Sequence, residues 1–473
     1  MASHEMWRDE LQAWLLARDS GSLLDLWQNT RYEGHPLLWH LLLFVQTRVW
    51  ASPVAMQVLN WVLATAGATL ILHRAPFPFF LRLAVVFSYL PFYEYGVISR
   101  NYAATFLCLM LFAFLVVSKR PGLGAAAGAL AANASPMGMV LAPALALGLW
   151  ATMRRRAFVP VLLLGAGFLA AVLQCLPPAD YEHSRGWHTA WEPERVGYTV
   201  RNFAAAMLPL PADQLHFWNS SAVFHTGTAP FRWSDPRDGL AAVTVLGCVA
   251  GIAWLVWRCR PALAVWLAGS VSLLSFAYLK FPGALRHAGF LWVLTLVVLW
   301  MAGPQARLGS LLLAGLLTLA AVVGDLGTLV AVRWEMRAAF SGAACAAERL
   351  RTEAFDRLPI VAGCDFAASG VAAFLPGKRI LYPAIGSRGT FVVWNLARLR
   401  QDSMSERELV TAAAAVDEGQ GVVILDNRPL GLPDSPSLQC RLILKCQPTI
   451  VADEEQWVYL CRAMPSGNHG GRP

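Results

Sequence analysis

The segment VAMQVLNWVLATAGATLIL, residues 54–72, contains no charged residue and no histidine. A helix that spans a membrane needs about 20 predominantly apolar residues, and this segment has that length. In the whole chain of 473 residues, 56% are hydrophobic and only 14% are charged, whereas roughly 25% of the residues of a soluble protein carry charge. The sequence therefore predicts an α-helical polytopic membrane protein.

Similar apolar segments recur on the C-terminal side of residues 54–72. They lie near residues 78–97, 101–118, 122–135, 137–152, 157–175, 239–257, 262–279, 286–303 and 308–330. Together these segments predict about 10 or 11 transmembrane helices. We expect an N-terminal transmembrane module over residues 54–175 and a C-terminal one over residues 239–330.

Basic residues cluster at every second connection between these segments. Cytoplasmic loops of membrane proteins are enriched in Lys and Arg, so we expect these connections to be cytoplasmic. Residues 1–53, the loop 176–238 and the tail 331–473 then lie on the exoplasmic side. The same pattern accounts for the formal net charge of +8, and nucleic acid is not an expected partner. The clusters are His73 with Arg74, Lys119 with Arg120, Arg154 to Arg156, Arg258 with Arg260, and Arg307.

The segment HPLLWHLLLFVQTRVW, residues 35–50, interrupts the series of spans. It is short and contains His40, Gln46 and Arg48, so we expect an interfacial helix. Residues 1–35 then lie outside with no preceding helix to carry them across. We expect a further span upstream of the present start, in preference to translocation of a short N-terminus.

The tail alternates short apolar strands with helical stretches, which is typical of an α/β fold. LPIVAG (358–363), TFVVWN (390–395) and GVVILDN (421–427) predict strands, and SERELVTAAAAV (405–416) predicts a helix. Residues 331–473 are therefore expected to form a soluble exoplasmic α/β domain.

The cysteines of the tail do not define a disulfide framework. Their number is odd, although Cys440 and Cys446 can approach one another. No Cys/His spacing in the chain matches a zinc site. The cysteines of the tail are Cys345, Cys364, Cys440, Cys446 and Cys461.

Three groups of charged residues lie at the exoplasmic ends of apolar segments, where the positive-inside rule does not explain them. Charged groups at such a boundary are costly and often functional. Carboxylates there can act as a general base, and cations can hold the phosphate of a lipid. The groups are Asp9, Glu10, Arg31, Glu33 and His35; Glu94, Arg100 and Tyr102; and Lys280, Arg286 and His287.

Three motifs occur in a fixed order: RDELQAWLLARDS (8–20), YEGHPLLWHLLLF (32–44) and SRNYAATFL (99–107). They resemble the first two exoplasmic loops of GT-C-type membrane glycosyltransferases, in particular the bacterial relatives of protein mannosyltransferases and aminoarabinose transferases. That family carries an Asp-Glu pair, a juxtamembrane helix beginning at a His-Pro or Pro-Pro step, and an Arg-x-Tyr step. The likeness covers roughly residues 5–120, and the chain departs from the pattern in lacking the first span.

The resemblance implies a GT-C-like transferase that moves a sugar from a polyprenyl-phosphate-linked donor to an exoplasmic glycan, lipid or protein acceptor. It places the enzyme in the bacterial inner membrane with a periplasmic active site, and residues 1–53 become the catalytic loop with its juxtamembrane helices. A sugar hydroxyl is a weak nucleophile, and a positioned carboxylate contributes about 10²–10⁴-fold by taking its proton. The implied roles are as follows: Asp9 and Glu10 catalytic; Arg100, Tyr102, Lys280, Arg286 and His287 at the donor phosphate; Glu33, His35 and Glu94 in support of the acceptor or loop.

Each of these residues also has a simpler explanation. Asp9 and Glu10 suit the first turn of any helix, and Arg100 suits an interface where its side chain reaches water. Lys280, Arg286 and His287 flank an ordinary turn, and Glu94 suits a hydrogen bond to a neighbouring helix. Glu33 and His35 fit either a helix cap or a divalent metal site, so the need for a metal stays open.

The aromatic residues of the loop 176–238 fit a sugar groove or an interfacial belt. Two other functions remain as alternatives for the whole chain. One is a membrane transporter or lipid flippase, which needs polar residues near the bilayer midplane. The other is a non-catalytic membrane scaffold that presents the tail domain to a partner.

Overall fold

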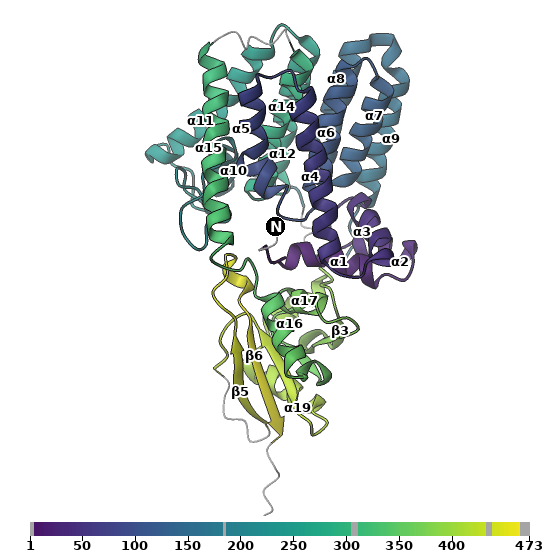
Figure 1. Ribbon diagram of the computed structural model, residues 1–473, viewed down its shortest axis with the longest axis vertical. Coiled ribbons are helices and arrows are strands. Elements are labelled where there is room, and N and C mark those ends of the chain that lie inside the picture. The colour runs from purple at the N-terminus through teal and green to yellow at the C-terminus, as the bar shows by residue number, and fades with distance from the viewer. Residues whose placement is uncertain (1–3, 183–185, 304–310, 432–437, 464–473) are drawn as a thin grey trace, which may run out of the picture.

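The computed structural model describes residues 4–182, 186–303, 311–431 and 438–463. A bundle of long helices forms one end of the molecule, and a smaller domain with a β-sheet forms the other (Figure 1). Short helices formed by the first 50 residues lie between the two. The chain therefore brings its N-terminal segment to the junction of its two main parts.

The helical bundle follows the apolar segments of the sequence. Among the described residues, six helical stretches are long and apolar enough to cross a membrane: Val54–Arg74, Pro136–Met153, Pro236–Val256, Arg260–Leu279, Leu285–Ala302 and Leu317–Glu335. This confirms a helical membrane protein. It does not confirm the expected 10 or 11 spans, because other apolar helices, such as Tyr102–Val117 and Phe158–Gln174, are shorter. The bundle helices are α4 (Val54–Arg74), α5 (Phe79–Phe87), α6 (Tyr102–Val117), α7 (Pro121–Ala134), α8 (Pro136–Met153), α9 (Phe158–Gln174), α11 (Pro236–Val256), α12 (Arg260–Leu279), α14 (Phe290–Ala302) and α15 (Leu311–Glu335).

The second expected span, residues 78–97, is not one continuous helix, so that prediction is wrong. Helix α5 ends at Phe87, and a π-helical turn, η1 (Leu90–Glu94), follows it. Pro91 has no amide hydrogen and cannot continue the α-helical hydrogen bonds. The amide of Tyr95 then bonds to the carbonyl of Leu90, five residues earlier, at 2.9 Å, which is the π-helical pattern. The break turns the chain toward the loop that carries Arg100.

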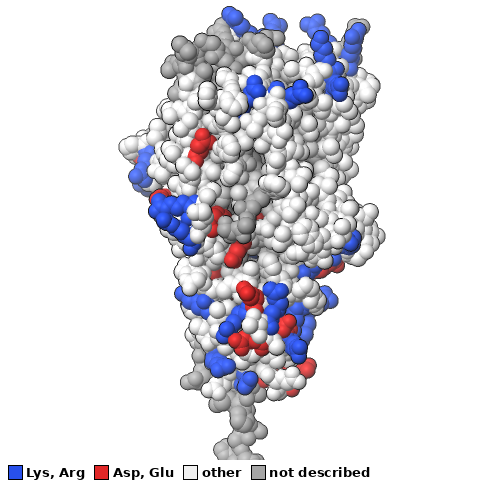
Figure 2. All heavy atoms as spheres, viewed as in Figure 1, with Lys and Arg blue, Asp and Glu red and all other residues white. Residues whose placement is uncertain are grey.

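The basic clusters lie at one end of the bundle. The connections α4–α5, α6–α7, α8–α9 and α11–α12 share the end that faces away from the C-terminal domain (Figure 1). Figure 2 shows Lys and Arg side chains gathered at that end, beyond a broad uncharged surface. This is the charge distribution that the positive-inside rule predicts for a membrane protein. Arg307 lies outside the described residues.

The C-terminal domain contains a six-stranded sheet in the order β3-β2-β1-β4-β6-β5. Strand β1 is parallel to β2 and β4, and β6 is antiparallel to β4 and β5. The expected strand at TFVVWN is wrong, because residues 390–395 leave the sheet, and their C-terminal end bonds to residues 180–182 of the loop 176–238. The elements are α16 (Ala343–Thr352), β1 (Ile360–Ala362), α17 (Asp365–Ala373), β2 (Ile380–Tyr382), β3 (Ser387–Gly389), α19 (Glu406–Val416), β4 (Val422–Asp426), β5 (Leu438–Lys445) and β6 (Trp457–Ala463).

Two disulfides join parts of this domain, Cys345–Cys446 and Cys440–Cys461. The expected approach of Cys440 to Cys446 is wrong. Cys440 lies in β5 and Cys446 directly follows that strand. Six steps along extended chain separate two Cα atoms by about 20 Å. Cys440 instead faces Cys461 on the neighbouring strand.

The loop 176–238 contains a helix that the sequence analysis did not anticipate, α10 (Pro193–Met207). Its Arg201 makes a buried, two-pronged ion pair with Asp238 at the start of α11, with N–O distances of 2.6 and 2.8 Å. The amphipathic face of α10 packs on the bundle. The aromatic loop is therefore partly a structured layer against α11.

Helices α1 (Arg8–Asp19), α2 (Leu23–Thr30) and α3 (Leu38–Val49) form the layer between the bundle and the sheet domain (Figure 1). Helix α3 has only 12 residues, which is too short to span a bilayer. It buries Trp39, His40 and Leu43 while the other side of the helix is open. These features agree with the interfacial helix expected for residues 35–50.

Candidate active site

Helix α1 places the Asp-Glu pair in its first turn. The Glu10 carboxylate accepts a hydrogen bond from the backbone amide of Trp7, at 3.1 Å, and so caps the helix. Its other oxygen accepts from the amide of Ser99, at 2.5 Å. Because Glu10 is fully buried and both oxygens are bonded, its position suits holding the Arg100 loop against α1.

Asp9 lies on the same turn but faces two arginines. Its Oδ2 pairs closely with Arg100 and lies 3.5 Å from Nη2 of Arg286. The structure therefore brings together one member of each of the three charged groups found in the sequence. The Asp9 side chain is 30% exposed, so its carboxylate is partly open to solvent.

The neighbouring cations determine the protonation of Asp9. Burial alone would raise the pKa of its carboxyl group, but the guanidinium groups of Arg100, Arg286 and Arg8 outweigh this effect and hold the pKa below its ordinary value. Asp9 is therefore ionised at neutral pH and available to accept a proton.

Arg286 lies in the short helix α13 (Leu285–Ala288) and is packed between two indole rings. Its guanidinium carbon lies 5.5 Å from the ring centre of Trp7 and 4.9 Å from that of Trp218. Its Nε is buried and has no hydrogen-bond partner among the described residues, and the same holds for Nε1 of Trp7. Unused donors beside a cation favour an anionic ligand.

Tyr102 and His287 form a pair beside this cluster. The His287 Nδ1 accepts from the amide of Ala284, at 2.9 Å, so the neutral ring carries its hydrogen on Nε2, which lies 2.9 Å from the Tyr102 hydroxyl. Arg100 lies over the Tyr102 ring, at 5.6 Å. Lys280 directly follows α12, in the same turn region that leads to Arg286, and is half-buried.

Glu33 and His35 lie in the turn between α2 and α3. Gln12 of α1 donates to the Glu33 carboxylate at 2.7 Å. Burial, with the nearby Asp9 charge, raises the pKa of Glu33 to about 7 despite that bond. His35 donates from Nδ1 to the Glu33 carbonyl, at 2.7 Å, and burial together with Arg100 lowers its pKa to about 4. The described residues contain no group of three or more His, Cys, Asp or Glu side chains arranged to hold a metal ion.

Glu94 is fully buried in η1 and accepts two hydrogen bonds. They come from the Tyr89 hydroxyl and from Nε1 of Trp218, both at 3.0 Å. Through Trp218 it fixes one of the two rings that hold Arg286. Glu94 therefore supports the cluster through Trp218, which belongs to the loop 176–238, and its other partner, Tyr89, directly precedes η1.

A buried network that the sequence analysis did not identify adjoins Glu10. His4 lies 3.1 Å from the Glu10 carboxylate and 2.9 Å from Glu335, at the end of α15. The Tyr93 hydroxyl donates to the same Glu335 oxygen, at 2.7 Å. Burial opposes protonation of His4, but the two carboxylates outweigh it and raise the pKa of His4 to about 10. The protonated ring therefore links α1, α15 and η1.

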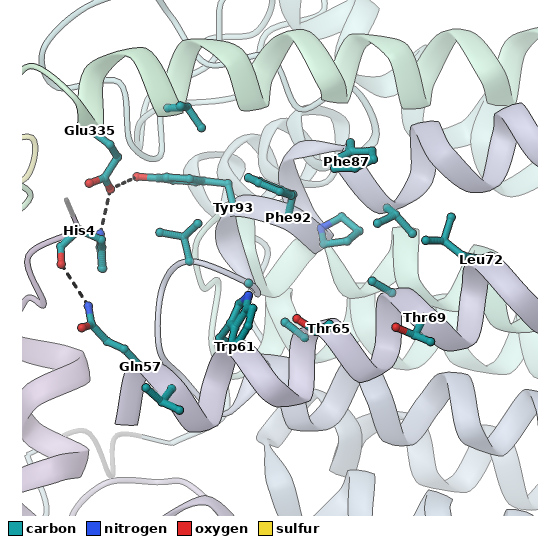
Figure 3. A pocket seen from close by; sticks show the side chains of 18 of the residues that line it. His4, Gln57, Trp61, Thr65, Thr69, Leu72, Phe87, Phe92, Tyr93 and Glu335 are labelled. Atoms are coloured by element: carbon teal, nitrogen blue, oxygen red, sulfur yellow. Dashed lines mark hydrogen bonds and ion pairs between the residues drawn. The ribbon is translucent and has the colours of Figure 1, made fainter. Parts of the chain in front are cut away.

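A long apolar groove of about 840 Å³ starts at this network. Figure 3 shows His4, Tyr93 and Glu335 at one end, while Trp61, Thr65, Thr69 and Leu72 line it along α4. Residues of α5, η1 and α15 close its other sides. The groove thus runs along the membrane helices. At its polar end His4 bonds to Glu10, the residue after Asp9.

Arg8 connects the site to the C-terminal domain. Its guanidinium lies 2.7 Å from Asp453 and 3.2 Å from the fully buried Glu454, and its carbon lies 4.4 Å from the ring centre of Phe366. Gln12 also exchanges two hydrogen bonds with the backbone of Val392, at 2.7 and 3.0 Å. Helix α1, which carries Asp9, is therefore clamped by the C-terminal domain.

No protein-family model, curated protein or solved structure matches the chain.

Proposed function

We propose that the protein is a GT-C-like glycosyltransferase that moves a sugar from a polyprenyl-phosphate-linked donor to a hydroxyl of an exoplasmic glycan, lipid or protein. One observation carries the proposal: the partly exposed Asp9 carboxylate lies between Arg100 and Arg286, and Arg286 Nε and Trp7 Nε1 have no hydrogen-bond partner among the described residues. A base and an anion-binding group thus stand within one site, as this reaction requires.

The chemistry follows from these contacts. The acceptor oxygen attacks the anomeric carbon, its proton passes to Asp9, and the bond from that carbon to the phosphate oxygen breaks with the electron pair on phosphate. Arg286 makes the longer contact with Asp9, so the donor phosphate competes with Asp9 for Arg286 while Arg100 keeps Asp9 in place. When the sugar donor is bound, its phosphate draws Arg286 away from Asp9, and the loss of this neighbouring positive charge makes the Asp9 carboxylate more basic.

The apolar groove beside His4 supports a lipid-linked donor. It offers a polyprenyl chain a path between α4, α5 and α15, with its polar end near the Asp9 turn. A chain bound there would place its phosphate near His4, at the end of the groove that adjoins Glu10. Because the groove is formed by membrane helices, a lipid-linked donor could reach the site from the bilayer.

The two disulfides support an exoplasmic C-terminal domain, because disulfides persist in oxidising compartments. The basic end of the bundle supports the same orientation. We assign the enzyme to a bacterial inner membrane with its site on the periplasmic side, as the resemblance implies.

A transporter is the second candidate function, because the buried His4 bridging Glu10 and Glu335 beside a membrane groove also suits a proton relay. A scaffold without catalysis would leave the arginine-paired Asp9 without a role. Both alternatives predict that no sugar is transferred.

The deciding experiment measures transfer from a radiolabelled polyprenyl-phosphate sugar into membranes that contain the protein. Asp9→Asn and Arg100→Ala are compared with Asp25→Asn, which removes an exposed carboxylate from α2 in the same opening segment. We expect transfer by the native protein and Asp25→Asn, and its loss in the other two at equal expression and insertion. Full transfer by Asp9→Asn would exclude the proposed mechanism.

A further inference from the structure

The C-terminal domain contains a second cavity, of about 170 Å³, at the carboxyl ends of β1 and β4. These parallel neighbours mark a switch point of the sheet, because β2, the next strand in the chain after β1, pairs with the opposite edge of β1. In open α/β sheets, ligands bind outside the carboxyl ends of strands at such a point. Gly363, Asn427 and Arg428, which follow the two strands, all line the cavity.

Asp426 ends β4 and is the polar centre of this cavity. Its side chain is 4% exposed, and its Oδ1 accepts from the amides of Asn427 and Arg428, at 2.8 and 3.2 Å. Its Oδ2 has no hydrogen-bond partner among the described residues. A Cβ atom on Gly363 would lie 2.0 Å from that oxygen, so only glycine leaves space for it.

The lining fits a small ligand with hydroxyl groups and an apolar face. Asp426 and Glu406 offer carboxylate acceptors, the guanidinium of Arg428 offers donors, and Leu409 and Leu430 offer apolar surface. Asp402 also lines the cavity, but Arg398 pairs with it at 3.0 Å, and Arg428 Nε lies 3.9 Å from Asp426, so two of the three carboxylates have a cationic neighbour. The volume is below the roughly 300–1,000 Å³ of sites for drug-sized molecules, so a single ring fits and an oligosaccharide does not.

We propose that this cavity binds one monosaccharide ring. The cavity also adjoins the contacts that hold α1. Phe366 lines the cavity, and the guanidinium of Arg8 packs on its ring. Asn427, another lining residue, donates to the Asp453 carbonyl at 3.1 Å. Assigning the bound ring to the acceptor rests on the proposed function, whereas binding of the ring does not. The C-terminal domain then recognises the acceptor next to the turn that carries Asp9.

The test uses the full chain in a detergent without a sugar headgroup. Saturation-transfer NMR measures binding of glucose, mannose, galactose and arabinose to the native protein, to Asp426→Asn and Glu406→Gln, and to Glu418→Gln, an exposed carboxylate outside the cavity. We expect at least one sugar to bind, with a Kd at least tenfold weaker in Asp426→Asn and unchanged in Glu418→Gln. Asn keeps the oxygen that accepts the two amides, so the turn is preserved.

The outcomes separate this proposal from the proposed function. If a thermal melt shows that Asp426→Asn is unfolded, Glu406→Gln, which also changes the cavity lining, decides in its place. No bound sugar among the four, or equal binding by the native protein and the cavity variants, overturns the sugar site even where transfer activity is found. Binding that Asp426→Asn weakens, in a protein without transferase activity, leaves the sugar site standing and removes the catalytic proposal.

Discussion

Arg286 Nη2 lies 3.5 Å from Asp9 Oδ2, which joins the first helix of the chain to the short helix that precedes α14. Trp7, two residues before Asp9, packs on the same guanidinium. Because Arg286 keeps an unused buried donor, the contact with Asp9 does not exhaust its capacity for hydrogen bonds.

The first prediction concerns the hydrogen-bond donor of Arg286 that has no partner among the described residues. Arg286→Ala is expected to lower kcat about 10²–10³-fold, because it removes the donor that stabilises the departing phosphate. Arg286→Lys keeps the charge but not the planar fork, so we expect an intermediate rate. Arg333→Ala, which breaks an exposed ion pair with Asp213, is the control. A native rate in Arg286→Ala would remove Arg286 from the mechanism.

The second prediction concerns the clamp on α1. Arg8→Ala leaves the buried Glu454 without its countercharge, so we expect the free energy of unfolding to fall by about 1–3 kcal/mol, measured by denaturation in detergent. Adding Glu454→Gln to Arg8→Ala is expected to restore part of the loss. An Arg8→Ala protein as stable as the native one would show that the C-terminal domain does not hold α1 through this contact.

The sequence predicted the helical membrane part well because an apolar run of membrane length has few alternatives. It failed at residues 78–97, where the π-helical turn Leu90–Glu94, which contains Pro91, cannot be read from hydropathy. It also failed at TFVVWN, where alternating apolar residues serve contacts such as that of Val392 with Gln12 instead of a strand. Periodicity reports which residues are buried but not what buries them.

The site was predictable in part. Asp9, Arg100 and Arg286 were identified because charge at an apolar boundary is unusual, and they do meet. Trp7 and Trp218 were not identified, because tryptophan is common near membrane interfaces and its role as a wall depends on a contact between distant segments. The only sequence signal for Glu335 was a lone carboxylate at the end of an apolar run.

The third prediction concerns the apolar groove. Thr65→Trp places a large ring in the groove and is expected to raise the KM for a polyprenyl-linked donor several-fold while kcat changes little. Ala66→Trp, one residue further on α4 and outside the groove lining, is the matched control. Equal KM values in the two variants would show that the donor chain binds elsewhere.

The fourth prediction concerns the disulfide Cys345–Cys446, which closes a separation of 101 residues. Replacing both cysteines by alanine is expected to cost about 2–5 kcal/mol of stability, because the cross-link restricts the unfolded chain. A thermal melt with and without reductant measures the effect, and Cys175→Ala, at a cysteine without a disulfide, is the control. A reductant-insensitive melt of the native protein would contradict the prediction.

The last prediction concerns Glu33. Its pKa is about 7 in the folded protein against an ordinary 4.5, so between these values the folded state holds a proton that the unfolded chain has released. Stability therefore falls as pH rises from 4.5 through 7, by on the order of 2–3 kcal/mol. Glu33→Gln keeps an oxygen for the bond from Gln12 and does not titrate, so its Tm should exceed that of the native protein by more at pH 8 than at pH 5. Glu418→Gln is the control for loss of an exposed charge. A Tm difference between Glu33→Gln and native protein that stays constant from pH 5 to pH 8 would show that Glu33 ionises normally.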